Sequence, residues 1–596
     1  MLTKKLFKVY ILGNNTKKSQ VIADLQEKGI LHIVESDYKS EEFIKDKSLP
    51  GTEDLSLISL KLKTLIEQTN IKDELKIKSV PALKTTKKEA ENILKKYYDK
   101  VQKQIASKNK LKEKIKSVTS KLNSIKNLPF HFTVPKTKNI ATQLYLSNSR
   151  ESFDFGSLNT KLIVNKITHK KVIYYKISTL KQNLKKLTEA LKTSSLKKID
   201  ISFVSDSTQS TIVSLENEIN NISKQIEVIN EQIHSLVVKD KKKILFTFLA
   251  VKNHLNSLTI ANLFQVSKKH FLVKGFVEKD NLEELKKLKE VTIFYDEPGE
   301  GAPTKLNNKG FSKNFEDLTK LYSLPKYGAI DPTSLISFFY PLFFGLMLSD
   351  VGYGILTLIL GLFLSVKYNI KKQITSIILI SSISAILFGF MFGSFFGELI
   401  SIPVILGSSF ELSYRILIAS LIIGLIHMNL GIILNAYQKF SGKFNIKDII
   451  EVTKYPLIQV IIVLFVFNLN TLAFLFLGLL LAMVLYDKKL LGLMDITGFF
   501  GTWFSYARIL ALNLATAGVA LAVNILASKT LEIQTWGVLL FVLIILLGHL
   551  FNLVVSLIGC SINAARLHYV EFFGQFFKSG GIPYKVFSLK KELKLT

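Results

Sequence analysis

The sequence predicts a mostly α-helical protein in two parts. The first is a cytoplasmic α/β dumbbell, whose two lobes are joined by an antiparallel coiled coil. The second is a C-terminal polytopic membrane domain of about eight helices, ending in two long tilted helices. Lys residues crowd the chain before Asp331, whereas long apolar runs with short polar loops fill it from Asp331 to Phe577. The mean hydropathy of +0.28 over 596 residues is also too high for one soluble enzyme.

Two stretches of the soluble sequence, residues 1–325, show the same order of strand, helix and strand. The first covers residues 5–40, and the second begins near residue 244 with the run ILFTFLAV and continues through FLVKGFVE to VTIFYDEP. We expect these stretches to build one lobe, and strand-like runs such as TQLYLS and KVIYYKIS to build another. The predicted ranges are 1–85 with 240–325 for the proximal lobe, 90–127 with 205–238 for the coiled coil, and 128–200 for the distal lobe.

The coiled coil is predicted from apolar residues that alternate at spacings of three and four, which is the heptad pattern. The first helix carries Leu111, Ile115, Val118, Leu122 and Ile125, and the second carries Leu215, Ile219, Ile222, Ile226, Ile229, Ile233 and Leu236. The charged faces of these helices are either solvated surface or docking sites for other helices.

The membrane domain, 331–577, begins with an apolar run that is too long for one crossing. As a single helix, Leu335–Val366 would span about 48 Å, against a hydrocarbon core of about 30 Å, so we expect a break at Asp350, Gly352 and Gly354. Lys-containing loops fall on one side of the membrane together with both termini. This pattern predicts a multi-pass protein of the cell membrane with cytoplasmic N- and C-termini and a cytoplasmic tail at 578–596. The further predicted spans are Ile374–Phe396, Leu412–Tyr437, Pro456–Asn468, Leu472–Tyr486, Ile496–Leu526 and Trp536–Phe573.

Composition excludes several classes of site. A net charge of +31 favours acidic partners or an anionic membrane surface, and we expect no nucleic acid partner. A single cysteine, Cys560, excludes an intramolecular disulfide and a Cys-based zinc site, so neither a metal nor a cofactor is expected in this chain. The GxxxxGK[ST] pattern does not occur, which argues against a catalytic ATP site here.

Arg508 is the first candidate for a functional site. Only four of the 78 basic residues are Arg, so a general need for positive charge does not explain this one. It lies inside the apolar helix GTWFSYARILALNLATAGVALAVN, where a charge is costly. A face of small residues continues from it and predicts a close partner helix: Ala511, Ala515, Gly518 and Ala522. Such residues also serve static helix packing, but packing does not explain a permanent charge on the same face.

A second candidate is a polar stripe on the final helix. Its members recur at spacings of four and three: Asn552, Ser556, Gly559, Asn563 and Arg566. The stripe is interpreted as the wall of a water-filled path. The alternative is a set of hydrogen bonds between helices, which Asn and Ser also form in membranes.

Other polar residues of the membrane half each have two interpretations. Glu398 gathers cations at an outer mouth or is an interfacial residue. Glu571 recruits ions at the cytoplasmic mouth or forms an interfacial cap or salt bridge. Asp350 is a half-channel candidate, although a cap at the helix break explains it better. His427 fits a hydrogen-bonded packing residue, and Asp495 suits the start of a helix.

Five motifs of the membrane half are DPTSLISFFYPLFFGLMLSDVGYG, FGSFFGE, IGLIHMNLGIILN, SYARILALNLA and INAARLHYVEFFGQFF. They resemble the a-type subunit, or subunit I, of bacterial and archaeal V-type and A-type rotary ATPases. The resemblance implies a membrane stator whose last two helices face a rotor ring of c-type subunits, with two offset half-channels that pass H+ or Na+. It places the essential Arg on Arg508 and a second Arg on Arg566.

The resemblance also implies partners. These are the c-type ring, helical peripheral stalk subunits of E/G type, a central stalk subunit of C/d type, and membrane lipid. Ser556 and Thr516 stand where some relatives carry Glu and His, which leaves the identity of the ion open. Two other interpretations are a secondary transporter with a cytoplasmic coiled-coil regulatory domain and a membrane-anchored scaffold, and the scaffold does not explain Arg508.

Overall fold

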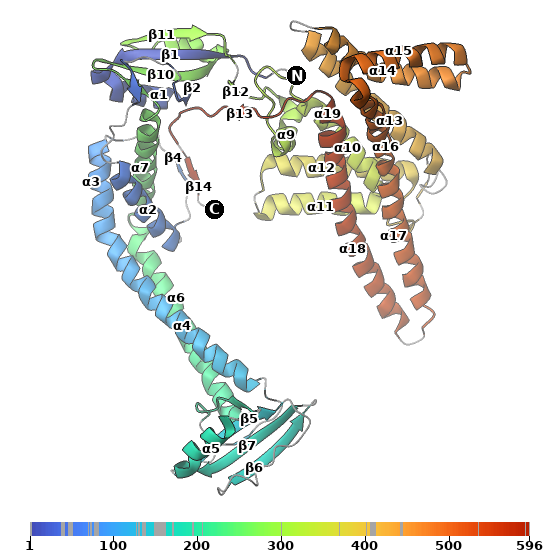
Figure 1. Ribbon diagram of the computed structural model, residues 1–596. Coiled ribbons are helices and arrows are strands. Elements are labelled where there is room, and N and C mark those ends of the chain that lie inside the picture. The colour runs from blue at the N-terminus through green and yellow to red at the C-terminus, as the bar shows by residue number, and fades with distance from the viewer. Residues whose placement is uncertain are drawn as a thin grey trace. The chain divides into compact units, whose positions relative to one another are not determined.

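A computed structural model divides the chain into two units (Figure 1): Met1–Phe43 with Gln265–Phe587, called unit 1, and Ile44–Phe264 with Ser588–Thr596, called unit 2. Unit 1 contains a β-sheet and the apolar helices, and unit 2 contains the coiled coil. The structure describes residues 3–594 except 37, 39–41, 46–51, 70, 72–73, 77–80, 82, 127, 129–131, 134–138, 148–161, 170–171, 193–195, 205–206, 300, 369, 401, 404, 406–412, 441–444, 534–535 and 591.

The main sheet of unit 1 joins strands from distant parts of the sequence. Its strands within unit 1 are β1 (Leu6–Asn14), β2 (Leu31–Val34), β9 (Gln265–Val266), β10 (His270–Glu278) and β11 (Val291–Asp296). The central strand β10 pairs antiparallel with β1, β2 and β9, and β11 pairs antiparallel with β1. Alternate residues of β1, such as Val9 and Ile11, are buried, as expected for a sheet with one covered face. Helices α1 (Lys18–Lys28) and α8 (Leu282–Lys286) connect these strands.

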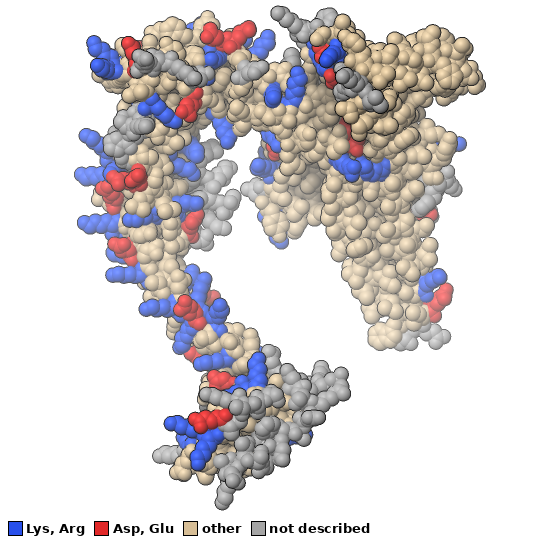
Figure 2. All heavy atoms as spheres, viewed as in Figure 1, with Lys and Arg blue, Asp and Glu red and all other residues tan. Residues whose placement is uncertain are grey.

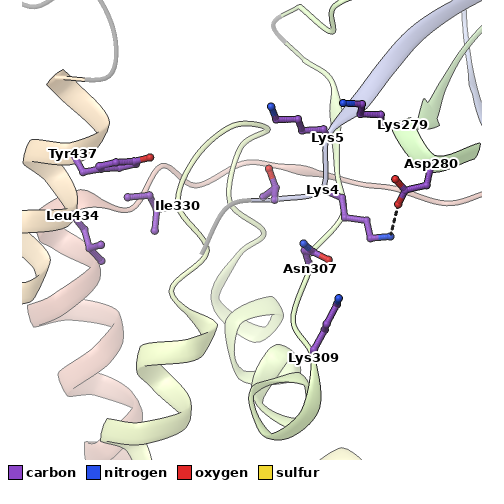
Figure 3. Close-up of a pocket in the computed structure, with 10 residues that line it drawn as sticks. Lys4, Lys5, Lys279, Asp280, Asn307, Lys309, Ile330, Leu434 and Tyr437 are labelled. Carbon is purple, nitrogen blue, oxygen red and sulfur yellow. Dashed lines mark ion pairs between the residues drawn. The ribbon is translucent and has the colours of Figure 1, made fainter. Parts of the chain in front are cut away.

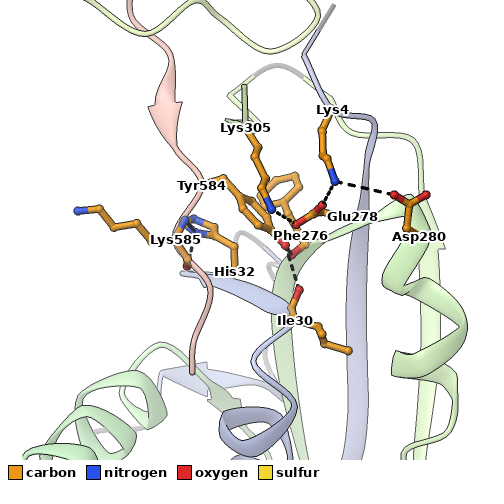
Figure 4. A network of polar contacts seen from close by, with 9 residues as sticks. All are labelled: Lys4, Ile30, His32, Phe276, Glu278, Asp280, Lys305, Tyr584 and Lys585. Atoms are coloured by element: carbon orange, nitrogen blue, oxygen red, sulfur yellow. Dashed lines mark hydrogen bonds and ion pairs between the residues drawn. The ribbon is translucent and has the colours of Figure 1, made fainter. Parts of the chain in front are cut away.

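The segment after the last membrane helix returns to this sheet. Strand β13 (Ile582–Pro583) pairs in parallel with β12 (Pro303–Thr304), and the Phe587 N–H donates to the Leu31 carbonyl at 2.7 Å. The Tyr584 hydroxyl donates to the Ile30 carbonyl at 2.9 Å (Figure 4). Residues 577–587, here called the strap, therefore tie the end of the membrane domain to the sheet.

A buried carboxylate lies beside the strap (Figure 4). Glu278, at the end of β10, pairs with Lys4 at 2.7 Å and with Lys305. Burial by itself raises the pKa of Glu278, but the hydrogen bonds from Lys305 and Lys4 outweigh burial and hold that pKa below its ordinary value. The carboxylate therefore stays ionised and anchors two lysines of the sheet.

After the sheet, unit 1 continues with one short charged helix and then with apolar helices in the predicted order. They are α9 (Glu316–Tyr322), α10 (Thr333–Leu348), α11 (Val351–Tyr368), α12 (Lys372–Phe392), α13 (Ser413–Phe440), α14 (Ile446–Val466), α15 (Asn470–Lys488), α16 (Leu493–Phe504), α17 (Arg508–Thr530), α18 (Gly537–Arg566) and α19 (Phe573–Phe576). Among described residues, six helices or continuous helical spans are long and apolar enough to cross a membrane, while α10 and Asn470–Tyr486 are shorter. The count of eight crossings stays a prediction. Figure 2 shows almost uncharged surface over these helices.

The two final helical spans are the longest among the described residues of unit 1. Leu493–Thr530 runs through α16 and α17 for 38 residues, and Gly537–Phe576 runs through α18 and α19 for 40 residues. They lie side by side along much of their length (Figure 1). A helix of 38 residues spans about 57 Å, which exceeds the hydrocarbon core of about 30 Å. Tilt or projection beyond the membrane is therefore required, as expected.

The helix break at Asp350 is confirmed. Helix α10 ends at Leu348, α11 begins at Val351, and Ser349 between them has a left-handed φ of 31°. The Asp350 carboxylate accepts the Tyr353 N–H at 2.9 Å, which caps the first turn of α11.

Unit 2 contains the predicted coiled coil. Helices α4 (Asp99–Lys126) and α6 (Thr208–Val238) pack along each other, with Val118, Leu122 and Leu215 in the shared core. Beyond one end lies a four-stranded antiparallel sheet covered by α5 (Leu184–Lys192). Its strands are β5 (Ile140–Ser147), β6 (Leu162–His169), β7 (Val172–Leu180) and β8 (Lys197–Ile199). Residues 148–161 of the predicted distal lobe lie outside the described residues.

The remaining elements of unit 2 show that one sequence expectation is wrong. The run ILFTFLAV was expected as a strand of the proximal lobe, but it lies in helix α7 (Lys241–Ala261). Its side chains are buried on almost every side against α2 (Thr52–Gln68) and α3 (Leu83–Ile93), so they carry no helical period. The short strands of this unit are β3 (Ile44–Lys45), β4 (Glu74–Lys76) and β14 (Glu592–Lys594), of which β4 and β14 pair.

Candidate functional site

Two helices bring both candidate arginines to one buried carboxylate. Arg508 Nη1 lies 3.7 Å from Glu571 Oε1, and Arg566 Nε lies 4.0 Å from the same oxygen. The Glu571 side chain is 2% exposed, against 22% for Arg508 and 53% for Arg566. Both distances exceed that of a hydrogen bond. The cluster of these three residues, here called the arginine pair site, therefore holds two cations around one anion.

The arginine pair site leaves polar atoms unsatisfied. Within the described part of the chain, neither Arg508 Nη1 nor Glu571 Oε2 has a hydrogen-bond partner, although both atoms are buried. Buried charged groups are normally hydrogen-bonded, because leaving them unpaired is costly. The site therefore carries one excess positive charge, and Arg508 keeps a hydrogen-bond donor that the described residues do not use.

A local change of helix type creates this site. Residues 567–572, at the end of α18, form a π-helical turn that includes Glu571. In a regular α-helix, residues five apart differ by about 140° in direction, so Arg566 and Glu571 would point apart. The wider π-turn joins residues i and i+5, and therefore brings both side chains to one face.

A hydrogen-bond chain runs along α17 and α18 on the other side of Arg508. The Asn524 amide donates to the carbonyls of Phe396 at 2.7 Å and Gly397 at 2.9 Å, so its oxygen faces His549 Nε2 at 2.9 Å. His549 therefore donates from Nε2 and accepts the Tyr353 hydroxyl at Nδ1, 2.7 Å away. The neutral tautomer of His549 is fixed by these contacts.

The chain continues toward Arg508 through the predicted stripe. Asn552 Nδ2 donates to the Tyr353 hydroxyl at 2.8 Å and to the Thr516 carbonyl at 3.0 Å. The Ser556 hydroxyl donates to Asn552 Oδ1 at 3.2 Å and accepts the Thr516 hydroxyl at 3.1 Å. The residues of this run, Asn524, His549, Tyr353, Asn552, Ser556 and Thr516, are here called the polar ladder. All six are buried.

The predicted stripe on α18 thus divides in two. Asn552 and Ser556 join hydrogen bonds between helices, which matches the alternative interpretation for that half. Asn563 is half-buried and donates to the Gly559 carbonyl of its own helix at 2.8 Å, and Arg566 is exposed. Whether water follows the stripe stays a prediction.

Asp350 holds the start of α11 and the 394–397 loop together through four hydrogen bonds. Its carboxylate accepts the Ser394 hydroxyl at 2.6 Å and the N–H groups of Tyr353, Phe396 and Gly397 at 2.9, 3.1 and 3.0 Å. The loop it holds has left-handed φ at Phe396, Gly397 and Glu398, and a Cβ at Gly397 would lie 2.4 Å from the Ala520 Cβ. Four donors leave this carboxylate no free lone pair of good geometry, so the cap interpretation explains it.

Glu398 lies far from the arginine pair site, whereas the small-residue face of α17 begins at Ala511, three residues after Arg508. Glu398 is exposed and follows Gly397, which contacts Asn524, 16 residues or about 24 Å along the helix from Arg508. On α17, Ala511, Ala515 and Ala522 are exposed and Gly518 is half-buried. The described part of this chain therefore does not supply a close partner for that face.

Comparison with known proteins finds a family model and several relatives that agree with one another. The V-type ATPase 116 kDa subunit family matches residues 142–416. The A-type ATP synthase subunit I of Methanothermobacter thermautotrophicus is 29% identical over 70% of this chain and 66% of its own length. The same subunit of Archaeoglobus fulgidus is 26% identical over 98% of both chains. Over most of its length the chain is therefore similar to subunit I of A-type ATP synthases.

Both of these relatives are the subunit I of an A-type ATP synthase. The chain spans just under two thirds of the length of the Methanothermobacter relative. A crystal structure of the cytoplasmic N-terminal domain of subunit I, homolog of subunit a, of V-ATPase aligns over 49% of this chain with a TM-score of 0.27 and 10% identity.

The prediction of a hydrogen-bonded packing residue at His427 is confirmed, whereas the contacts of His568 and the ion pair of Asp495 were missed by sequence reasoning. His427 donates or accepts at Nδ1 with the Tyr506 hydroxyl at 2.9 Å and stacks on Phe572, with ring centroids 4.1 Å apart. His568 lies 5.0 Å from His427 between ring centroids. Asp495, expected only to suit a helix start, also pairs with Lys454 at 2.5 Å. These partners come from separate helices, so no spacing within one helix indicates them.

Proposed function

We propose that this chain is the membrane stator of a rotary A/V-type ATPase, in which a rotor carboxylate exchanges H+ or Na+ at Arg508. The observation that carries the proposal is the arginine pair site: a guanidinium inside an apolar span with a buried atom left without a hydrogen bond. The same helix presents small, exposed residues beside Arg508, as a face against which another helix can move closely.

Arg508 would act by ionising the rotor carboxylate. A carboxyl that carries its ion is neutral and tolerates lipid, and a nearby fixed cation favours its charged form. At about 4 Å and an effective dielectric of about 20, such a pair gains about 4 kcal/mol, or about three pKa units. That gain is enough to release an ion. Lys would serve less well, because desolvation removes its proton.

Glu571 would stabilise the Arg508 guanidinium while no rotor carboxylate is near it. Its carboxylate lies 3.7 Å from Nη1, close enough to lower the cost of a buried guanidinium. Because this contact is not a hydrogen bond, a rotor carboxylate can compete for Arg508 without breaking one. Glu571 is therefore a positioning residue in this proposal.

The two half-channels would lie at opposite ends of the final helices. The strap joins the Arg566 end of α18 to the sheet, so this end faces the side of the membrane that carries the sheet. We assign the cytoplasmic half-channel to Asn563, Arg566 and Glu571. The outer half-channel would begin near Glu398 and follow the polar ladder, whose residue Thr516 lies eight residues, or about 12 Å, from Arg508.

The proposed partners follow from this role. A c-type rotor ring would cover Ala511, Ala515, Gly518 and Ala522. Helical peripheral stalk subunits of E/G type would bind unit 2, and a central stalk subunit of C/d type would contact the complex on the side of the sheet. The family match favours this assignment over a secondary transporter with a regulatory coiled coil.

ATP-driven ion uptake by proteoliposomes of the purified complex tests the proposal. Arg508→Ala should abolish uptake while the complex assembles, and Arg508→Lys should restore little. Arg415→Ala is the matched control, because Arg415 is an exposed Arg of the same domain and should leave uptake unchanged. ATP-driven ion uptake close to the wild-type rate in Arg508→Ala would contradict the proposed role of Arg508.

A further inference from the structure

A basic hollow lies where the sheet of unit 1 meets the membrane helices (Figure 3). Its volume is about 860 Å³. The polar wall comes from the residues that lead into β1 and follow β10, and it includes Lys5 and Lys279. The opposite wall is apolar: Ile330 lies just before α10, and Leu434 and Tyr437 lie in the last turns of α13. The hollow therefore has one cationic and one membrane-side wall.

The charges of this hollow are unbalanced. Four lysines line it, and Asp280 is the carboxylate among its lining residues. Lys4 is already paired, at 2.7 Å with Glu278 and 3.9 Å with Asp280. Lys5, Lys279 and Lys309 are exposed and make no ion pair with the described residues. Three ammonium groups are thus available for an anion.

A second hollow extends this one. Its volume is about 720 Å³, and it shares Ile330 and Tyr437 with the first. It adds Lys326 and Lys578, which are also exposed. The two hollows therefore flank one apolar ridge at the level where α10 begins and α13 ends, and both surround that ridge with lysines.

We propose that the basic hollow binds the phosphate headgroup of an anionic phospholipid from the leaflet on the side of the sheet. Lys5, Lys279 and Lys309 would contact the phosphate, and the glycerol end would lie against Leu434 and Tyr437. An amphipathic ligand fits both walls, whereas a free phosphate uses the cationic wall alone. Basic pockets beside membrane helices and Tyr at the membrane interface are typical of headgroup sites. The assignment goes beyond ion translocation and does not depend on Arg508.

Native mass spectrometry of the full chain in detergent tests this site. The chain is titrated with phosphatidylglycerol, with phosphatidylcholine, and with glycerol phosphate as the soluble source of the same group. Wild type should retain phosphatidylglycerol over phosphatidylcholine. The variant Lys5→Gln, Lys279→Gln, Lys309→Gln should lose at least tenfold in apparent affinity for phosphatidylglycerol. Tyr437→Ser should weaken retention of the lipid by several-fold.

The matched control changes three exposed lysines of the same unit that do not line the hollow: Lys268→Gln, Lys287→Gln and Lys289→Gln. It has the same net charge as the test variant and should bind phosphatidylglycerol like wild type. Equal loss in both triple variants would show a general charge effect and overturn the site. Displacement of the lipid by equimolar glycerol phosphate would show a free-anion site instead. Circular dichroism melting of each variant identifies any loss of binding that is caused by unfolding. If the triple variant unfolds, Tyr437→Ser, which keeps every lysine, tests the site instead: retention of phosphatidylglycerol at the wild-type level in a folded Tyr437→Ser would overturn it.

Discussion

Asp350 and Glu571 are both acids buried in the membrane domain, each 2% exposed, yet their surroundings differ. Four donors surround Asp350 at 2.6–3.1 Å, and they come from its own helix start and from the 394–397 loop. Glu571 has two cations at 3.7 and 4.0 Å, and one of its oxygens has no hydrogen-bond partner among the described residues. A carboxylate that accepts hydrogen bonds at all its positions, as Asp350 does, holds a backbone in place. Glu571 makes no hydrogen bond to Arg508 and so leaves Arg508 able to bind another carboxylate, which is what an exchange site requires.

The largest effect on folding should follow from removing the Asp350 carboxylate, which accepts four hydrogen bonds. Asp350→Ala leaves three N–H groups and one hydroxyl without their acceptor, each at a cost of about 1–3 kcal/mol. We expect the 394–397 loop to lose its conformation and the yield of folded protein to collapse, measured by size exclusion and thermal melting in detergent.

Glu571→Gln sharpens the comparison because it should separate folding from transport. The melting temperature should stay within a few degrees of wild type, since the ion pairs there are long. ATP-driven uptake should fall about tenfold, the effect of about 1.4 kcal/mol on a rate barrier. If instead Glu571→Gln unfolds the protein as Asp350→Ala does, the two acids have the same role and the distinction fails.

Thiol labelling distinguishes water from dry packing along the polar stripe. After Cys560→Ala, single cysteines are placed at Ser556, Asn563 and Leu557. A small water-soluble reagent reacts with the thiolate, which hydrocarbon disfavours. We expect Asn563→Cys and Ser556→Cys to react at least several-fold faster than Leu557→Cys. Equal and negligible labelling in an active complex would assign the stripe to packing.

The smallest effect concerns a half-buried histidine outside the membrane, His32. The Lys585 N–H donates to His32 Nδ1 at 2.9 Å, and burial lowers the pKa of His32 below its ordinary value of 6.5. The neutral ring is therefore favoured in the folded strap. Its contribution is fully present above about pH 6.5 and is lost as the pH falls through the lower folded pKa.

Hydrogen exchange of the strap checks this pH dependence. After correction for intrinsic rates, residues 582–587 should exchange a few-fold faster at pH 5 than at pH 8. His32→Gln should remove that difference, because Gln does not titrate. A pH response that persists unchanged in His32→Gln would assign it to another group.

The sequence predicts a feature of the fold or the site when the interacting residues belong to one local pattern, and it does not when they lie on separate helices. The heptads specify the coiled coil because both helices carry their own pattern, and the length of Leu335–Val366 predicts the break at Asp350. Arg508 is conspicuous because its apolar context is local. The run ILFTFLAV was misassigned because a fully buried helix has no period. Glu571 was noted as a salt-bridge alternative, but its position beside Arg508 depends on a π-turn and a second helix, which no spacing in α18 indicates.

The central claim is that a rotor carboxylate gives up its ion at Arg508, so that no carboxylate carries a bound ion past this residue from one half-channel to the other. Passive ion flux tests it most directly, in proteoliposomes of the assembled complex with an imposed ion gradient and no ATP. With Arg508→Ala, rotor carboxylates should pass between the half-channels with their ions bound, so flux should rise well above that of wild type and of Arg415→Ala. Flux through Arg508→Ala that stays at the wild-type level while ATP-driven uptake continues would contradict the account.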